Sequence, residues 1–164
     1  MTEEATTKRI LLVCTGNICR SPLAAALLER ALAERTIEGI VVSSAGTGAW
    51  DGAPVSEGAY LVGLERGLDL SSHRARLLTR ELVEGADLIL TMARHHRARV
   101  DELGGEGRVF VLGEYAGRDG DAAEVSDPFG GDLEVYRDTC SEVEALLETA
   151  VERIVKEFAS GSQR

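Results

Sequence analysis

The segment CTGNICR, residues 14–20, contains a cysteine and an arginine separated by five residues. Cys14 follows an apolar run, and Arg20 precedes a serine, a proline and an alanine-rich stretch. A loop between a strand and a helix N-terminus can turn its N–H groups inward to bind an anion, aided by the helix dipole. Arg20 can hold two phosphate oxygens as a bidentate fork. The same positive field favours the thiolate of Cys14, the nucleophilic form of a cysteine.

The loop therefore has the residue types of a phosphate cradle with a nucleophile at its base. Gly16 allows a backbone conformation that a β-carbon would resist. Ser21 can donate a hydrogen bond to the Cys14 sulfur when the sulfur is displaced from a bound phosphoryl group. A Walker-type phosphate loop is excluded, because the segment has no Gly-Lys-Ser/Thr. A buried structural cysteine near an unrelated surface arginine is the simpler alternative. It leaves the strand before the loop, and the serine, proline and helix after it, unexplained.

The elements that must position this loop alternate along the chain. Apolar runs predict strands at residues 9–14, 39–46, 86–92 and 108–112. Helical periodicity predicts helices at residues 21–35, 55–66, 79–84, 93–103 and 132–158. Ser21 is the expected N-cap of the first helix, and the last helix is expected to break near Cys140. Residues 47–54, 66–76 and 113–131 are predicted to be loops or irregular segments.

This alternation predicts an α/β fold: a single doubly wound domain with a four-stranded parallel sheet and helices on both faces. Neither an internal repeat nor a linker divides the chain. We therefore expect one domain over residues 9–158, with a loose N-terminus at residues 1–8 and a loose C-terminus at residues 159–164. In such sheets, ligands bind beyond the carboxyl ends of the strands, where Cys14 is expected to lie.

Composition narrows the possible partners. The formal net charge of −10 argues against nucleic-acid binding, so an anionic substrate must meet a local positive site. No stretch approaches the roughly 20 apolar residues of a membrane span, and the polar N-terminus is unlike a signal peptide, so a cytoplasmic protein without membrane insertion is expected.

The three cysteines are expected to be thiols. His95 and His96 are expected on a solvated helix face, and no metal ion or other cofactor is predicted.

The motif VCTGNICRSPLA resembles the signature of the low-molecular-weight protein-tyrosine phosphatases, Cys-x5-Arg-Ser near the N-terminus. SDPFGG at residues 126–131 is similar to the family's second motif, an Asp-Pro pair late in the chain. SSAG at residues 43–46 and the histidine of SSHRAR also lie where the family has them. The resemblance covers residues 8–158. It implies a protein phosphatase that forms a phosphocysteine intermediate without a metal ion; we expect a phosphorylated protein as its partner, and a monomer or weak dimer.

Carried over by motif, the resemblance implies a role for each site residue. Cys14 is the nucleophile, Arg20 binds phosphate and stabilises the transition state, and Asp127 is the general acid and then the general base. Asn17, Ser44 and His73 resemble residues that hold the loop by hydrogen bonds. An Asp-Pro pair is also a common turn initiator, and both roles are compatible. The residues expected to bind phosphate are Thr15, Gly16, Asn17, Ile18, Cys19, Arg20 and Ser21.

The roles of Cys19 and Trp50 each have two possible interpretations. In the family, a cysteine beside the nucleophile can protect it through a reversible disulfide formed from the sulfenic acid, and Cys19 could do so with Cys14. Cys19 is equally well explained as a small spare residue. Ile18, Trp50 and Phe129 are expected to line the substrate pocket. A partly buried core position is the alternative for Trp50.

The resemblance leaves the phosphorylated residue open between tyrosine and arginine. Tyrosine-directed members usually carry isoleucine inside the loop, as at Ile18, whereas arginine-directed members carry threonine there. Phe129 followed by two glycines is more similar to the arginine branch, because many tyrosine-directed members have tyrosines after Asp-Pro. We give Ile18 more weight because it should lie closest to the atoms that distinguish the substrates. A phosphotyrosine phosphatase is therefore predicted, with a protein-arginine phosphatase as the alternative.

Two other classes are less favoured. A thiol-dependent arsenate reductase has the same fold and a similar loop, but it needs relay cysteines in mid-chain. No cysteine lies between residues 20 and 139. An inactive phosphopeptide-binding module typically lacks the nucleophile or the acid, and Cys14 and Asp127 are both present.

Overall fold

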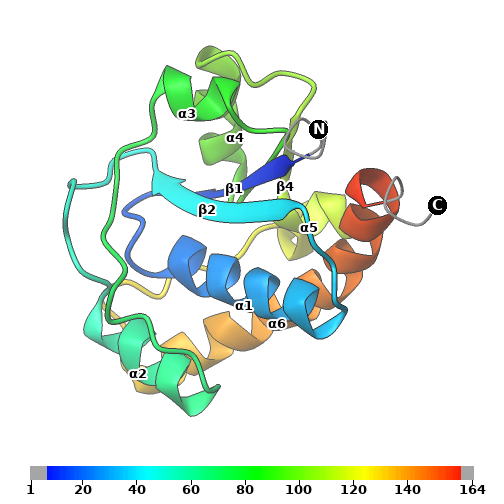
Figure 1. Ribbon diagram of the computed structural model, residues 1–164. Helices are drawn as coiled ribbons and strands as arrows, with labels where there is room; N and C mark the ends of the chain where they lie inside the picture. Colours follow the sequence, from blue (N-terminus) through cyan, green and yellow to red (C-terminus); the bar gives the residue numbers. More distant parts are fainter. Residues whose placement is uncertain (1–6, 160–164) are drawn as a thin grey trace.

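The computed structural model describes residues 7–159. Within them, four parallel strands form one sheet in the order β2-β1-β3-β4, with helices on both faces (Figure 1). The strands are β1 (Lys8–Cys14), β2 (Ile40–Gly46), β3 (Leu88–Thr91) and β4 (Val109–Val111). The helices are α1 (Arg20–Glu34), α2 (Glu57–Glu65), α3 (Arg80–Glu84), α4 (Arg94–Glu102), α5 (Leu112–Tyr115), the 3-10 helix η2 (Gly120–Ala123) and α6 (Leu133–Phe158). The predicted α/β class and the four-stranded parallel sheet are confirmed.

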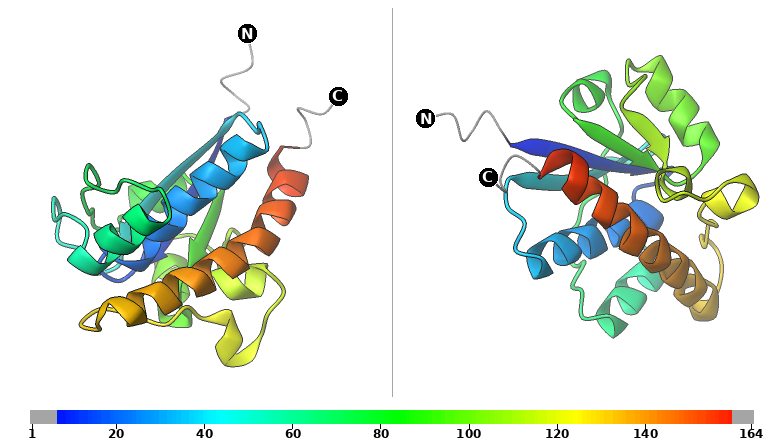
Figure 2. Two further views of the ribbon diagram at one scale, coloured as in Figure 1. Left: turned by 90° about the horizontal axis from the view of Figure 1, so that it is seen from below. Right: turned by 90° about the vertical axis from the view of Figure 1, so that its right-hand side faces the viewer.

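The apolar strands are buried on both faces. Along β1, Ile10 and Leu12 belong to a core cluster shared with α1 and α6, whereas Leu11 and Val13 belong to a second cluster with α3 and α4. This division follows from the strand period of two, which sends successive side chains to opposite faces. Figure 2 shows the two helical layers on either side of the sheet. The continuous apolar run of β1 is thus typical of a central strand covered on both sides.

Some local expectations are corrected. Helix α6 runs unbroken over 26 residues, so the predicted break near Cys140 is wrong; Cys140 is fully buried in the core. The predicted loop 113–131 contains most of α5 and all of η2. Strand β1 begins at Lys8, inside the segment predicted to be loose, and Ala159 caps α6. The remainder of the two predicted loose ends, residues 1–6 and 160–164, lies outside the described residues.

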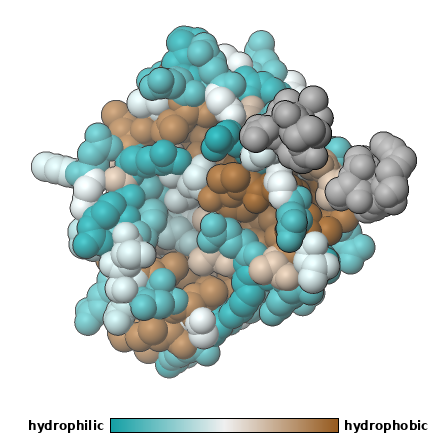
Figure 3. All heavy atoms as spheres, in the orientation of Figure 1, coloured by the Kyte–Doolittle hydropathy of each residue, from teal (hydrophilic) through white to brown (hydrophobic). Residues whose placement is uncertain are grey.

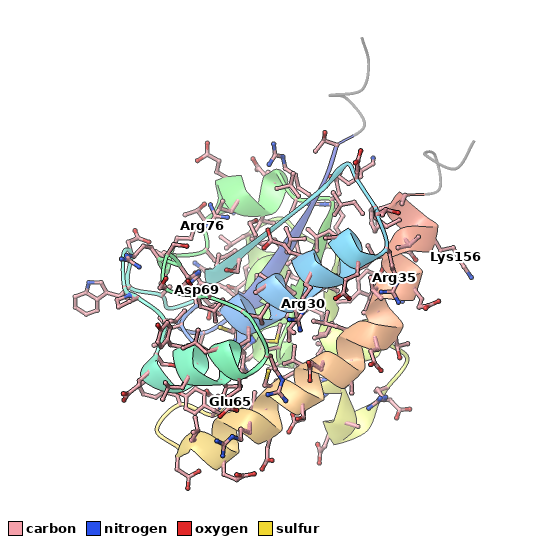
Figure 4. All side chains as sticks on the ribbon, turned by 60° about the horizontal axis from the view of Figure 1, so that its bottom comes forward. Arg30, Arg35, Glu65, Asp69, Arg76 and Lys156 are labelled. Atoms are coloured by element: carbon pink, nitrogen blue, oxygen red, sulfur yellow. The ribbon has the colours of Figure 1, made fainter. Side chains whose placement is uncertain are left out.

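Helix α2 is joined to α6 by ion pairs. Arg137 on α6 donates to Glu65, which is labelled in Figure 4, at 2.7 Å. Arg66 donates to Glu144 on α6 at 3.1 Å. The N-cap of α2 is Ser56, whose hydroxyl accepts a hydrogen bond from the Ala59 N–H. The ion pairs fix the C-terminal end of α2 beside α6, and the cap closes the first turn of α2.

Apolar and hydrophilic side chains are mixed over the surface (Figure 3). Trp50 and Phe129 are the most exposed large apolar side chains in the described part, at 84% and 68%. Leu61 and Leu64 on α2 are partly exposed, where Figure 3 shows apolar atoms at the lower end of the molecule. Among residues 7–159, no helix combines the length and the apolar character needed to cross a membrane.

The end of β2 lies very close to the loop after β1. A β-carbon added to Gly46 would lie 2.4 Å from the Thr15 carbonyl oxygen and 2.9 Å from the Asn17 nitrogen. The Gly46 backbone cannot easily move away from the loop, because its N–H donates to the Arg76 carbonyl and its carbonyl accepts from the Leu78 N–H. Residue 46 must therefore be glycine for this loop to adopt its path.

The close approach at Gly46 predicts that Gly46→Ala is destabilising by roughly 1–3 kcal/mol, since the new methyl group must displace backbone atoms. Gly48→Ala is the matched control, because its β-carbon would lie 3.8 Å from the nearest atom, the Thr15 methyl. Urea unfolding of both variants measures the difference. Equal stability of the two would contradict the proposed steric role of Gly46.

Candidate active site

The Cys14 sulfur lies at the carboxyl end of β1 and faces two hydrogen-bond donors. The Asn17 N–H donates to it at 3.3 Å, and the Ser21 hydroxyl lies 3.0 Å away. Asn17 Nδ2 donates to Ser21 Oγ at 2.8 Å, which leaves the Ser21 proton free to point at the sulfur. Both donors stabilise a negative sulfur, so the surroundings suit a thiolate nucleophile.

Asn17 fixes the shape of the loop. Its φ of 57° lies in the left-handed region, which asparagine tolerates better than most residues. Its side chain donates to Ser44 Oγ at 2.9 Å. It accepts at 3.0 Å from the N–H of Arg76, whose side chain is labelled in Figure 4. His73 Nε2 donates to the Asn17 carbonyl at 2.7 Å, and burial lowers the pKa of His73. The structure thus brings Asn17, Ser44 and His73 into one hydrogen-bonded network.

Arg20 is 4% exposed and lies between the loop and Asp127. One terminal nitrogen donates to the Val125 carbonyl at 3.1 Å, and the other lies 3.6 Å from the Asp127 carboxylate. The remaining nitrogen, Nε, is buried and has no partner within residues 7–159. A buried donor without a protein acceptor fits a site that binds an oxyanion.

Helix α1 begins at Arg20, one residue earlier than predicted. Its N-cap is Cys19, which makes no side-chain capping bond, so the prediction of Ser21 as N-cap is wrong. The physical reason is that the Ser21 hydroxyl is already bound to Cys14 and Asn17. Without a side-chain cap, the first N–H groups of α1 remain available to an anion.

The Asp127 side chain, 56% exposed, stands beside the Arg20 guanidinium. Its second oxygen accepts from the Phe129 N–H at 3.1 Å, so the expected turn is present. The preceding residue is anchored to α6, because Ser126 donates from its N–H and its hydroxyl to Glu142, at 3.1 and 3.0 Å. The loop is therefore anchored to α6 immediately before Asp127 and closed by a turn immediately after it, which limits the positions its carboxyl group can take.

A pocket of about 230 Å³ brings the three predicted catalytic residues together. Its lining residues are Cys14, Thr15, Gly16, Ile18, Cys19, Arg20, Asp127 and Phe129. Ile18 and Phe129 thus lie at the predicted pocket. Trp50 does not line it, and its 84% exposure also excludes the alternative of a partly buried core position.

Cys19 connects the loop after β1 to α2 and α6. Its sulfur lies 3.3 Å from both the Ser56 hydroxyl on α2 and the Tyr136 hydroxyl on α6. Burial raises the pKa of Cys19, which disfavours its thiolate. Cys14 and Cys19 are both free thiols in this structure. A disulfide between them stays a prediction.

His96 is a site residue that the sequence analysis missed. It is completely buried, and its Nε2 lies 2.8 Å from the Thr15 hydroxyl oxygen. The predicted solvated position holds for the exposed His95 and is wrong for His96. A signal was present in the sequence, because His96 and the buried Val100 are four residues apart and share one face of α4.

Two larger hollows in the described part of the chain have no cysteine in their lining. One of about 760 Å³ lies between α1 and α6, where Arg30 and Arg35 appear in Figure 4, and no cysteine or histidine lines it. Another of about 800 Å³ shares Arg20 and Asp127 with the pocket and adjoins it. In the described part of the chain, no cluster of three or more His, Cys, Asp or Glu side chains could hold a metal ion. Residue types, rather than volume, identify the site.

Known proteins resemble this chain over nearly its whole length. Residues 9–160 match the family described as low molecular weight phosphotyrosine protein phosphatase. A protein-arginine-phosphatase of Geobacillus stearothermophilus is 40% identical over 91% of this chain and 97% of its own length. The probable low molecular weight protein-tyrosine-phosphatase EpsP of Ralstonia solanacearum is 39% identical, over 90% and 96%.

The fold agrees with these similarities. The crystal structure of a low molecular weight protein tyrosine phosphatase from T. tengcongensis superposes with a TM-score of 0.82 at 37% identity, covering 89% of this chain and 99% of that one. The resemblance inferred from the two sequence motifs is thereby confirmed. The chain belongs to the low molecular weight phosphotyrosine protein phosphatase family of cysteine-dependent enzymes.

Proposed function

We propose that this protein hydrolyses phosphotyrosine in proteins through a phosphocysteine intermediate on Cys14. The observation that carries the proposal is the single pocket in which the Cys14 thiol, Arg20 and Asp127 meet. A nucleophile, a charge clamp and one proton shuttle are what a two-step displacement at phosphorus requires.

In the first step, the Cys14 thiolate attacks phosphorus. An S–P bond forms while the bond between phosphorus and the phenolic oxygen breaks. Arg20 and the loop N–H groups stabilise the charge on the other phosphoryl oxygens. Asp127 gives its proton to the departing phenolic oxygen, a role supported by its place in the lining of the same pocket as Cys14.

In the second step, water attacks the phosphorus of the phosphocysteine. The Asp127 carboxylate takes a proton from this water, and the S–P bond breaks with its electron pair returning to sulfur. The Ser21 hydroxyl and the Asn17 N–H, at 3.0 and 3.3 Å from that sulfur, stabilise the thiolate as it leaves. Inorganic phosphate is released and Asp127 is again protonated.

The pocket lining supports phosphotyrosine as the substrate. Ile18 and Phe129 supply apolar surface for an aromatic ring. Among the described residues that line the pocket, Asp127 carries the only carboxylate, and it is already needed as the acid. A guanidinium group has five N–H donors and is best bound where further acceptors are present.

Phosphoarginine is the second candidate. Phe129, followed by Gly130 and Gly131, is a lone aromatic residue that can stack on a guanidinium plane as well as on a phenol ring. The relatives named for arginine and for tyrosine are 40% and 39% identical to this chain, so identity does not distinguish them.

Asp127→Ala is expected to slow hydrolysis of a phosphotyrosine peptide by roughly 10²–10⁴-fold, the usual contribution of a general acid. The loss on p-nitrophenyl phosphate should be much smaller, because p-nitrophenolate leaves without protonation. Steady-state kinetics on both substrates provide the comparison, with the exposed Asp138→Ala as the control. Equal losses on the two substrates would argue against an acid role for Asp127.

Ile18→Thr is expected to shift the ratio of kcat/KM for phosphotyrosine over phosphoarginine peptides by roughly tenfold towards phosphoarginine, through loss of apolar contact with the ring. The wild type should prefer phosphotyrosine when the two peptides are assayed side by side. A wild type that prefers phosphoarginine would refute the proposed substrate. An unchanged ratio in the variant would remove Ile18 as its determinant.

A further inference from the structure

His96 reaches the phosphate loop from a different element. The chain leaves β3, which pairs with β1, and the Met92 N–H donates to the Val13 carbonyl at 3.0 Å. The first turn of α4 follows immediately and brings His96 against Thr15. The mechanism described above uses neither the imidazole nor the Thr15 hydroxyl.

The surroundings of the His96 ring select one tautomer. Nε2 lies 2.8 Å from Thr15 Oγ1, whereas Nδ1 is buried without a partner within residues 7–159. Burial, with smaller contributions from His95 and Arg20, lowers the pKa of His96 to about 3, so the ring is neutral near pH 7. A neutral imidazole has one N–H, and an unpaired buried N–H is among the rarest arrangements in proteins. The proton therefore resides on Nε2, which donates to Thr15.

This tautomer decides what the Thr15 hydroxyl can do. Its oxygen accepts from Nε2, and its own proton has no acceptor within residues 7–159. Thr15 is exposed and lines the pocket together with Cys14 and Arg20. The hydroxyl proton is thus available to an anion in the cradle.

We propose that His96 is a positioning residue that orients the Thr15 hydroxyl as a hydrogen-bond donor to the phosphoryl group bound above Cys14. This inference rests on the proposed function, because it takes the loop to bind phosphate. The donor chain runs from His96 Nε2–H to Thr15 Oγ, and from the Thr15 proton to a phosphoryl oxygen. A neutral ring supplies the orientation without adding a second positive charge beside Arg20.

A double-mutant cycle on inorganic phosphate binding tests the chain. Thr15→Val and His96→Leu should each weaken phosphate binding by roughly tenfold or more, as expected for a hydrogen bond to a charged group. The double variant should lose no more than either single variant, because both remove the same interaction. Titration calorimetry measures these dissociation constants without relying on turnover, so a wild type that binds phosphate but hydrolyses no phosphopeptide would refute the proposed function alone.

Conservative variants separate positioning from a structural role. Thr15→Ser keeps the hydroxyl, and His96→Gln keeps a nitrogen donor at similar reach, so both should retain most of the affinity. His95→Leu is the matched control on the exposed side of the same turn and should have no effect. Full affinity in Thr15→Val, or multiplying losses in the double variant, would overturn the proposal.

The tautomer can be observed directly in the wild type, which avoids any folding defect of the His96 variants. Long-range ¹H–¹⁵N correlation spectra should assign the ring proton of His96 to Nε2, with Nδ1 unprotonated. A proton on Nδ1 would overturn the inference, because Thr15 would then have to donate to the ring instead of to phosphate.

Discussion

The whole site depends on gathering positive charge and N–H donors around one sulfur atom in a chain of net charge −10. Arg20 is almost completely buried, and burying a guanidinium is costly unless it is paired. Its protein partners are a carbonyl and the partly exposed Asp127. Asn17, which shapes the loop, is uncharged, and burial lowers the pKa of His73, which donates to the Asn17 carbonyl. This arrangement supports the proposal that a phosphoryl group is the counterion of Arg20.

The strand order explains how distant segments reach this one point. The chain passes from the central β1 to β2 on one side and later to β3 on the other, so the loops at their carboxyl ends diverge from a common switch point. Cys14 lies at that point. β2 contributes Ser44 and the close approach at Gly46, while the helix after β3 contributes His96. The order of the strands therefore brings Cys14 and His96 to the same loop, although they are 82 positions apart in the chain.

The sequence predicts the structure best where local patterns decide it. The apolar strands, the parallel sheet and the cysteine–arginine loop followed from periodicity and spacing. The predictions are wrong where tertiary contacts override local preference: Ser21 looks like an N-cap, yet its hydroxyl is bound to Cys14. His96 looks solvated among arginines, yet it is buried against Thr15 in the loop after β1. Trp50 is predicted at the pocket but does not line it, because its position depends on the path of a loop that composition alone does not determine.

A crystal structure of the protein with vanadate would test the central claim most directly. The account predicts vanadium bonded to the Cys14 sulfur, with equatorial oxygens held by the loop N–H groups and the Arg20 guanidinium, and the Asp127 carboxyl group beside the apical oxygen. Vanadate bound elsewhere, or absent from this loop at saturating concentration while the fold is intact, would contradict it.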